Sequence, residues 1–125
     1  MESSRIVCQG IEVTHHGTTT VFLFKDRSLN FYVADKLKEQ VRESANAAVE
    51  GGCTRLVLDF AEVKIIDSTG VSQVVIANNI IRAAEGGEMV YLCNVKPFII
   101  KILEICRIAH HCNIFETQAE ALNHE

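Results

Sequence analysis

The chain has 125 residues, of which 48% are hydrophobic and 22% charged, and this composition predicts one compact domain spanning residues 1–125. Its net charge of −4 at pH 7 argues against binding to nucleic acid or to an anionic membrane surface. The apolar runs are too short to cross a bilayer, and the first residues lack the apolar core of a secretory signal. We therefore expect a soluble, cytoplasmic protein.

Two β-rich segments come first, and a helix is expected after them. The segments 6–14 and 18–24 are joined by the His-His-Gly triplet at 15–17, which predicts a β-hairpin with both histidines in the turn. Apolar or small residues recur at helical spacing over 33–49, with charged residues between them. This pattern predicts an amphipathic helix, which the Gly-Gly pair at 51–52 should end.

The remaining predicted elements alternate between strands and helices. Buried strands are expected at 55–60, 89–93 and 113–115, and helices at 71–84, from Pro97 to about residue 107, and from Thr117. The segment that begins at Thr117 has the spacing of a capping box, with Glu120 three residues later. Because strands and helices alternate after the hairpin, the sequence predicts an α/β fold with a parallel or mostly parallel sheet.

The segment Asp67-Ser68-Thr69-Gly70 lies between the strand at 55–60 and the helix at 71–84. Function gathers at the carboxyl ends of strands in such sheets, and free backbone N–H groups at a helix start favour a negative charge. We therefore expect this turn to suit a phosphate, either bound or attached to Ser68. An ordinary helix cap formed by Asp67 is the alternative interpretation, and the two are compatible.

The residues around this motif resemble the STAS domain family of anti-sigma factor antagonists. The resemblance lies first in residues 55–75 (RLVLDFAEVKIIDSTGVSQVV), where a strand and a six-residue link precede an Asp-Ser-Ser/Thr-Gly motif that opens a helix. It continues in the segment 28–41, the Gly-Gly pair at 86–87 and the closing segment 117–122. The resemblance implies the STAS fold, with a mostly parallel sheet of four or five strands, an N-terminal β-hairpin and about four packed helices.

The resemblance also implies a bacterial partner switch rather than an enzyme. In such proteins the serine after the aspartate accepts phosphate from an anti-sigma factor that is also a GHKL-type serine kinase. The unphosphorylated form binds that anti-sigma factor and frees the sigma factor, and a serine phosphatase restores the binding form. Carried over to this chain, Ser68 is the phospho-acceptor, with Asp67 and Thr69 beside it and Gly70 keeping the turn open. We expect no cofactor, and a monomer or weak homodimer.

Two departures from the family pattern bear on this site. Asn30 lies where the family often has an aspartate beside the phospho-acceptor, and its neutral side chain should reduce repulsion of a phosphate. The segment 105–112 replaces the family's usual short Gly-containing turn, so its local geometry is open.

From helix propensity alone, alanine at Gly70 should be neutral or slightly stabilising. A glycine that opens the surface to a kinase and partner should instead matter for function.

The helix at 71–84 has apolar residues around more than one face. They are Val71, Val74, Val75, Ile76, Ile80 and Ile81. Such a distribution fits either a helix that is covered on several sides or an apolar surface on which a partner lands beside Ser68. Val71 and Val74 are the candidates for that partner surface.

Two other functions stay open. One is a STAS interaction subunit of a transporter or signalling assembly that is not phosphorylated. The other is a small nucleotide-binding or enzymatic α/β domain, which is disfavoured because there is no nucleotide-binding glycine motif and no general base identifiable near Ser68.

We expect no metal site, since adjacent strand residues such as His110, His111 and Cys112 point to opposite faces. The five cysteines contain no C-x-x-C pair and are expected mainly as core thiols.

Overall fold

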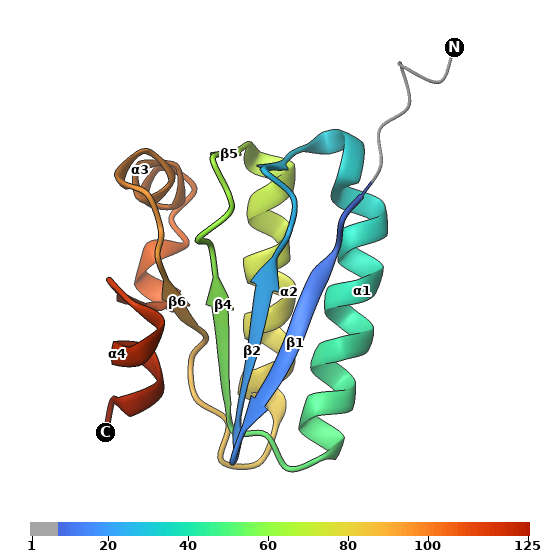
Figure 1. Cartoon of the computed structure of the whole chain (residues 1–125), viewed down its shortest axis with the longest axis vertical. Helices are drawn as coiled ribbons and strands as arrows, with labels where there is room; N and C mark the ends of the chain where they lie inside the picture. Colours follow the sequence, from blue (N-terminus) through green and yellow to red (C-terminus); the bar gives the residue numbers. More distant parts are fainter. Residues whose placement is uncertain (1–7) are drawn as a thin grey trace.

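A computed structural model describes residues 8–125 of the chain, and a five-stranded sheet lies at its centre (Figure 1). The strands, in their spatial order, are β1 (Ile11–His16), β2 (Thr19–Phe24), β4 (Arg55–Asp59), β6 (Tyr91–Cys93) and β7 (Asn113–Phe115). β1 pairs with β2 in antiparallel fashion, and every other neighbouring pair in this sheet is parallel. The predicted α/β fold, with a mostly parallel sheet and an N-terminal hairpin, is confirmed.

The hairpin turns at Gly17 and Thr18, so the prediction that both histidines lie in the turn is wrong. His15 and His16 belong to β1, where they pair with residues of β2. Gly17 has a φ of +64°, a backbone conformation that glycine adopts without strain, and two-residue hairpin turns require such residues. The part of the first predicted strand that precedes residue 8 lies outside the described residues.

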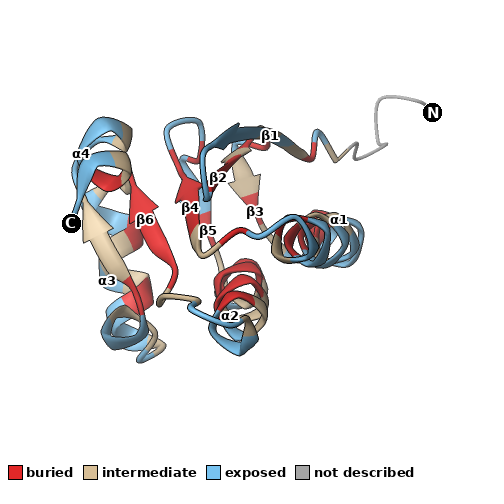
Figure 2. Ribbon diagram, turned by 90° about the horizontal axis from the view of Figure 1, so that it is seen from below, coloured by how far each residue is buried: buried red, intermediate tan, exposed pale blue. Residues whose placement is uncertain are grey.

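Helices cover both faces of the sheet (Figure 2). The helices are α1 (Phe31–Glu50), α2 (Ser68–Ala83), α3 (Pro97–Ile105) and α4 (Gln118–Asn123), with a short 3₁₀ helix at Ala109–His111. α1 and α2 lie side by side on one face, and α4 packs on the other face over β4, β6 and β7. The capping box predicted at Thr117 and Glu120 is present. In the part of the chain described here, no helix has the length and apolarity that crossing a membrane requires.

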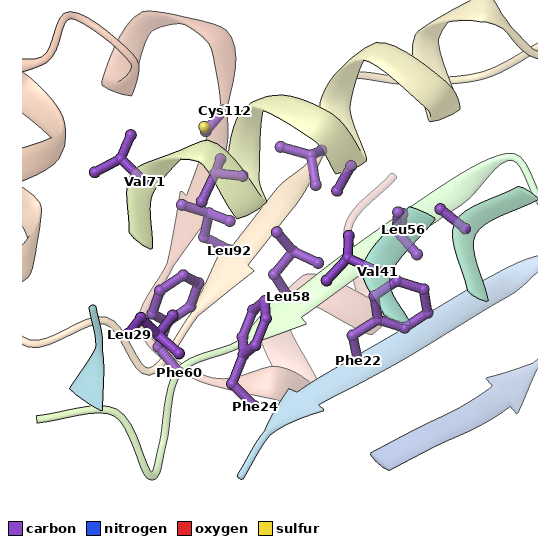
Figure 3. Close-up of a cluster of buried hydrophobic side chains, with 14 of the residues drawn as sticks. Phe22, Phe24, Leu29, Val41, Leu56, Leu58, Phe60, Val71, Leu92 and Cys112 are labelled. Atoms are coloured by element: carbon purple, nitrogen blue, oxygen red, sulfur yellow. The ribbon is translucent and has the colours of Figure 1, made fainter. Parts of the chain in front are cut away.

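The hydrophobic core lies mainly between the sheet and the helices α1 and α2. Alternate residues of the central strands point to this side, and Phe22, Leu58 and Leu92 are completely buried there (Figure 3). The residues between them, such as Val57 and Tyr91, form a smaller cluster with α4 on the other face. Burial on both faces explains why the central strands are apolar runs rather than alternating patterns.

Two strands of two residues each form a separate parallel pair at one end of the main sheet. They are β3 (Ser28–Leu29), which leads into α1, and β5 (Ile65–Ile66), which leads into α2. Their pairing holds the starts of α1 and α2 at the same level, at the upper end of Figure 1. Residue 30 follows β3 and residue 67 follows β5, so this small pair positions the predicted motif.

The segment between α3 and β7 differs from a glycine turn. α3 ends at Ile105, and Arg107 then takes a φ of +61°, which is the left-handed conformation that glycine commonly adopts after a helix. The 3₁₀ helix at Ala109–His111 follows. In the segment 105–112, a left-handed backbone conformation at Arg107 and a short 3₁₀ helix thus take the place of a glycine turn.

Candidate functional site

Asp67 caps the starts of two helices at once. Its Oδ1 accepts hydrogen bonds from the backbone N–H groups of Thr69 (2.9 Å) and Gly70 (3.0 Å) in α2. Its Oδ2 accepts a hydrogen bond from the backbone N–H of Phe31, the first residue of α1, at 3.2 Å. The interpretation of Asp67 as a helix cap is confirmed, and the same carboxylate also ties α1 to α2.

These hydrogen bonds set the acidity of Asp67. Partial burial by itself would raise its pKa, but hydrogen bonds from the Thr69 hydroxyl and from the backbone N–H groups of Gly70, Phe31 and Thr69 outweigh burial and hold the pKa below its ordinary value. The carboxylate is thus ionised at neutral pH and places a fixed negative charge next to Ser68.

Asn30 caps α1 with its own side chain. Its Oδ1 accepts a hydrogen bond from the backbone N–H of Tyr32 at 2.9 Å. The next residue, Phe31, donates its backbone N–H to Asp67, so the Asn30 cap and the Asp67 cap lie next to each other at the helix starts. An amide that fills this capping role adds no second negative charge to the one that Asp67 supplies.

Ser68 is the exposed residue of the predicted motif. It is the first residue of α2, and within residues 8–125 its hydroxyl makes no hydrogen bond. The neighbouring hydroxyls are engaged, because that of Thr69 donates to Asp67 and that of Ser72 donates to the Thr69 carbonyl. Among the three hydroxyls at the start of α2, the accessible and uncommitted one belongs to Ser68.

Gly70 is buried, so it does not keep the turn open to solvent. A Cβ at this position would lie 2.0 Å from the Leu29 carbonyl oxygen and 2.8 Å from Cγ1 of Ile66. Its backbone is helical, and the need for glycine comes from the close approach of α2 to β3 and β5. The expectation from helix propensity, that alanine would be neutral or stabilising, is therefore corrected.

Val71 and Val74 do not form a partner surface. Val71 is 4% exposed and Val74 is fully buried, and both belong to the main hydrophobic core, where Figure 3 shows Val71 on α2. Ile81 is also buried, while Val75, Ile76 and Ile80 are partly buried. The wide apolar distribution on α2 reflects a helix that is covered on several sides.

Three exposed apolar side chains that were not expected from the sequence lie on the elements next to the motif. Phe31 and Tyr32 are each 71% exposed at the start of α1, and Ile65 of β5 is 55% exposed. We call these three residues the Phe31 patch. The sequence held a signal for it, because Phe31 and Tyr32 precede the apolar stripe of the predicted helix at 33–49.

A shallow groove of about 440 Å³ runs along α2 from Ser68. It is lined on one side by Lys38 and Arg42 of α1 and on the other by Cys106 and Ile108, and no acidic residue lines it. Within the described range 8–125, no group of three His, Cys, Asp or Glu side chains is placed to hold a metal ion. The groove that starts at Ser68 is thus bordered by two cationic side chains of α1 and by apolar side chains of α2 and of the α3–β7 connection.

Comparison with known proteins places these features in a family. The model of the STAS domain matches residues 10–121. No curated protein sequence matches the chain significantly.

Solved structures share the fold. An anti-sigma-factor antagonist (STAS) domain protein from Planctomyces limnophilus is 24% identical, with a TM-score of 0.71 over 90% of this chain and 95% of that one. The phosphorylated form of the Bacillus cell fate determinant SpoIIAA is 21% identical, with a TM-score of 0.65 over 90% and 96%. A sulfate transporter family protein from Wolinella succinogenes is 16% identical, with a TM-score of 0.65 over 98% and 89%.

Proposed function

Because this chain belongs to the STAS domain family, we propose that it is a bacterial anti-sigma factor antagonist that works by partner switching. In this proposal, the unphosphorylated protein binds an anti-sigma factor that has GHKL-type serine kinase activity, and this binding frees a sigma factor. The kinase then phosphorylates Ser68 and ends the binding, and a serine phosphatase reverses the change. The protein regulates transcription in the cytoplasm and is not itself an enzyme.

The exposed, uncommitted hydroxyl of Ser68 is the observation that carries this proposal. A phosphate there adds about −1.5 to −2 charges at neutral pH. Asp67 already uses the N–H groups of Thr69, Gly70 and Phe31, so these groups cannot bind the phosphate, which stays exposed at the surface. A partner that covers Ser68 would then have to desolvate the phosphate, which weakens binding without unfolding the domain.

The Phe31 patch supports a docking role for the same end of the molecule. Phe31 and Tyr32 lie at the start of α1, directly beside the hydrogen bond that joins Phe31 to Asp67. Exposed aromatic residues are typical anchors of protein interfaces. We infer that the partner covers Ser68 and the Phe31 patch together.

Phosphorylation by the partner kinase tests the proposal. With kinase and ATP, the wild-type protein should gain one phosphate, and Ser68→Ala should gain none. Ser72→Ala is the matched control and should be phosphorylated like the wild type, because the Ser72 hydroxyl is bound to the Thr69 carbonyl. Mass spectrometry that places the phosphate on Thr69 or Ser72 would contradict the assignment to Ser68.

Removal of the patch aromatics should weaken docking. In the unphosphorylated state, Tyr32→Ala and Phe31→Ala should each bind the partner with an affinity about tenfold or more below that of the wild type. A loss of this size is typical of aromatic anchors. Both side chains are largely exposed, so the melting temperature should hardly change. Asn46→Ala, at an exposed position on the far half of α1, is the control for calorimetry and should bind normally. Unchanged affinity in both aromatic variants would remove the patch from the interface.

The shared fold with a sulfate transporter family protein favours a second candidate function. In that case the chain is an interaction subunit of a transporter or signalling assembly and is not phosphorylated. The same surface would dock a partner, but a negative charge at Ser68 would not regulate that docking, and no kinase would modify Ser68. The phosphorylation experiment separates the two functions.

A further inference from the structure

A second hollow lies along the later part of α2, and the proposed switch does not use it. It is a cleft of about 260 Å³ between α2 and the connection from α3 to β7. Helix α2 contributes Val74, Val75, Asn78, Asn79 and Arg82, and the connection contributes Ile108, His111 and Cys112. Such a volume is below the 300–1,000 Å³ that is usual for drug-sized ligands, so it suits a small metabolite.

Asn78 lines this cleft and has a hydrogen-bond donor that no described residue uses. The residue is 8% exposed, and its Oδ1 accepts a hydrogen bond from the backbone N–H of Val90 at 2.9 Å. This bond fixes the orientation of the amide, because only the oxygen can accept. Within residues 8–125, the Nδ2 group makes no hydrogen bond. In the same range, the only fully buried side-chain nitrogen or oxygen without a hydrogen-bond partner is Oε1 of Gln73, so Nδ2 of Asn78 is not fully buried. The donor therefore keeps some exposure, and Asn78 is one of the residues that line the cleft.

The other polar groups of the cleft are cationic or neutral. Arg82 brings a guanidinium, Asn79 a second amide and His111 an imidazole, and no Asp or Glu lines the cleft. Arg82 forms no ion pair with any described residue. A donor-rich lining without a carboxylate is complementary to an anionic oxygen ligand, and a guanidinium binds a carboxylate with two parallel hydrogen bonds.

The walls of the cleft are apolar. Val74 and Val75 lie on one side, and Ile108 and Cys112 on the other. Burial raises the pKa of the Cys112 thiol to about 11, so this side chain stays neutral at physiological pH and adds no repulsive charge. A bare inorganic anion would leave these walls without a partner, whereas a short alkyl chain would cover them.

From these features we propose that the cleft binds a short-chain carboxylate. Its carboxylate group lies against the Arg82 guanidinium and the Nδ2 donor of Asn78, and its alkyl chain packs against Val75 and Ile108. The site is separate from Ser68, but Val75 and Ile108 also line the groove that runs from Ser68.

Titration with butyrate, followed by NMR of ¹⁵N-labelled protein, tests the proposal. Butyrate should cause saturable shifts of the Asn78 side-chain amide and of the Ile108 backbone amide. Butyramide, which has the same shape without the charge, and inorganic phosphate, which lacks the alkyl chain, should each bind at least about tenfold more weakly. Absence of saturable shifts, or equal binding of butyramide, would overturn the proposal. Tighter binding of phosphate than of butyrate would also overturn the proposal, because the site would then be one for an inorganic anion.

Matched arginine variants complete the test. Arg82→Gln should weaken butyrate binding by about tenfold or more, because it removes the charge from the cleft. Arg27→Gln makes the same chemical change at an exposed arginine outside the cleft and should bind butyrate like the wild type. Arg82 is exposed as well, so neither variant should unfold. Butyrate binding that survives Arg82→Gln unchanged would contradict the assigned position of the carboxylate.

Discussion

Replacement of Gly70 by alanine is expected to lower the free energy of unfolding by about 2–3 kcal/mol, the upper part of the usual range for overpacking a tight interior site. The added Cβ would lie 2.0 Å from the Leu29 carbonyl oxygen, which belongs to backbone and cannot rotate away. Relief of the clash requires α2 to move from β3 and β5, and this movement would stretch the hydrogen bond from Phe31 to Asp67. The gain in helix propensity, at most about 1 kcal/mol, is too small to compensate.

Gly51→Ala provides the matched control for this prediction. Gly51 ends α1 with a φ of −84°, and a Cβ there would make only ordinary contacts, at 3.5 Å or more. Its substitution should leave stability unchanged or raise it slightly. Urea unfolding of both variants measures the difference. If Gly70→Ala unfolds at the same urea concentration as the wild type, the close approach of α2 to β3 is not what requires glycine.

Elements with a periodic signal could be predicted from the sequence. The apolar spacing located α1 to within two residues at its start, and the alternation of strands and helices gave the parallel sheet. The strands β3 and β5 were missed because two residues are too short to show a period. The apolar run of α2 begins only at Val71, whereas the helix begins at Ser68, because the polar residues after Asp67 interrupt the apolar pattern while continuing the helix.

In the candidate site too, features that depend on local sequence could be predicted, and features that depend on packing could not. The cap at Asp67 and the position of Ser68 in the first turn of α2 depend on local geometry, and the sequence analysis identified both. The roles of Gly70, Val71 and Val74 depend on which elements pack against α2, and local patterns carry no such information. The exposure of Phe31 and Tyr32 was missed although both residues lie outside the apolar stripe of α1, which is a signal that a sequence can show.

The hydrogen bonds of Asp67 connect the fold to the proposed switch. The carboxylate caps α2, binds the first N–H of α1 and lies next to Ser68 in the chain. Because these three N–H groups are already satisfied, a phosphate on Ser68 would gain little from the helix starts and would face the negative charge of Asp67. The proposed switch therefore acts through an exposed charge rather than through a rearranged helix cap.

Asp67→Ala should accordingly destabilise the domain by about 2 kcal/mol at pH 7, the upper part of the range for loss of a helix cap. The variant leaves the N–H groups of Thr69, Gly70 and Phe31 without their side-chain acceptor. Asp35→Ala is the control, because Asp35 is exposed in the second turn of α1, and its substitution should change stability by less than about 0.5 kcal/mol.

The pH dependence of this difference gives a second measurement. The pKa of Asp67 is lower in the folded protein than its ordinary value of about 4, so ionised Asp67 contributes its full stability above that pH. The contribution is lost as the pH falls through the folded-state pKa, where the carboxylate becomes protonated and can no longer accept all of its hydrogen bonds. Urea unfolding at several pH values should therefore show the gap between wild type and Asp67→Ala narrowing below about pH 4. A gap that stays constant across this range would mean that the charge of Asp67 does not contribute to its capping of α1 and α2.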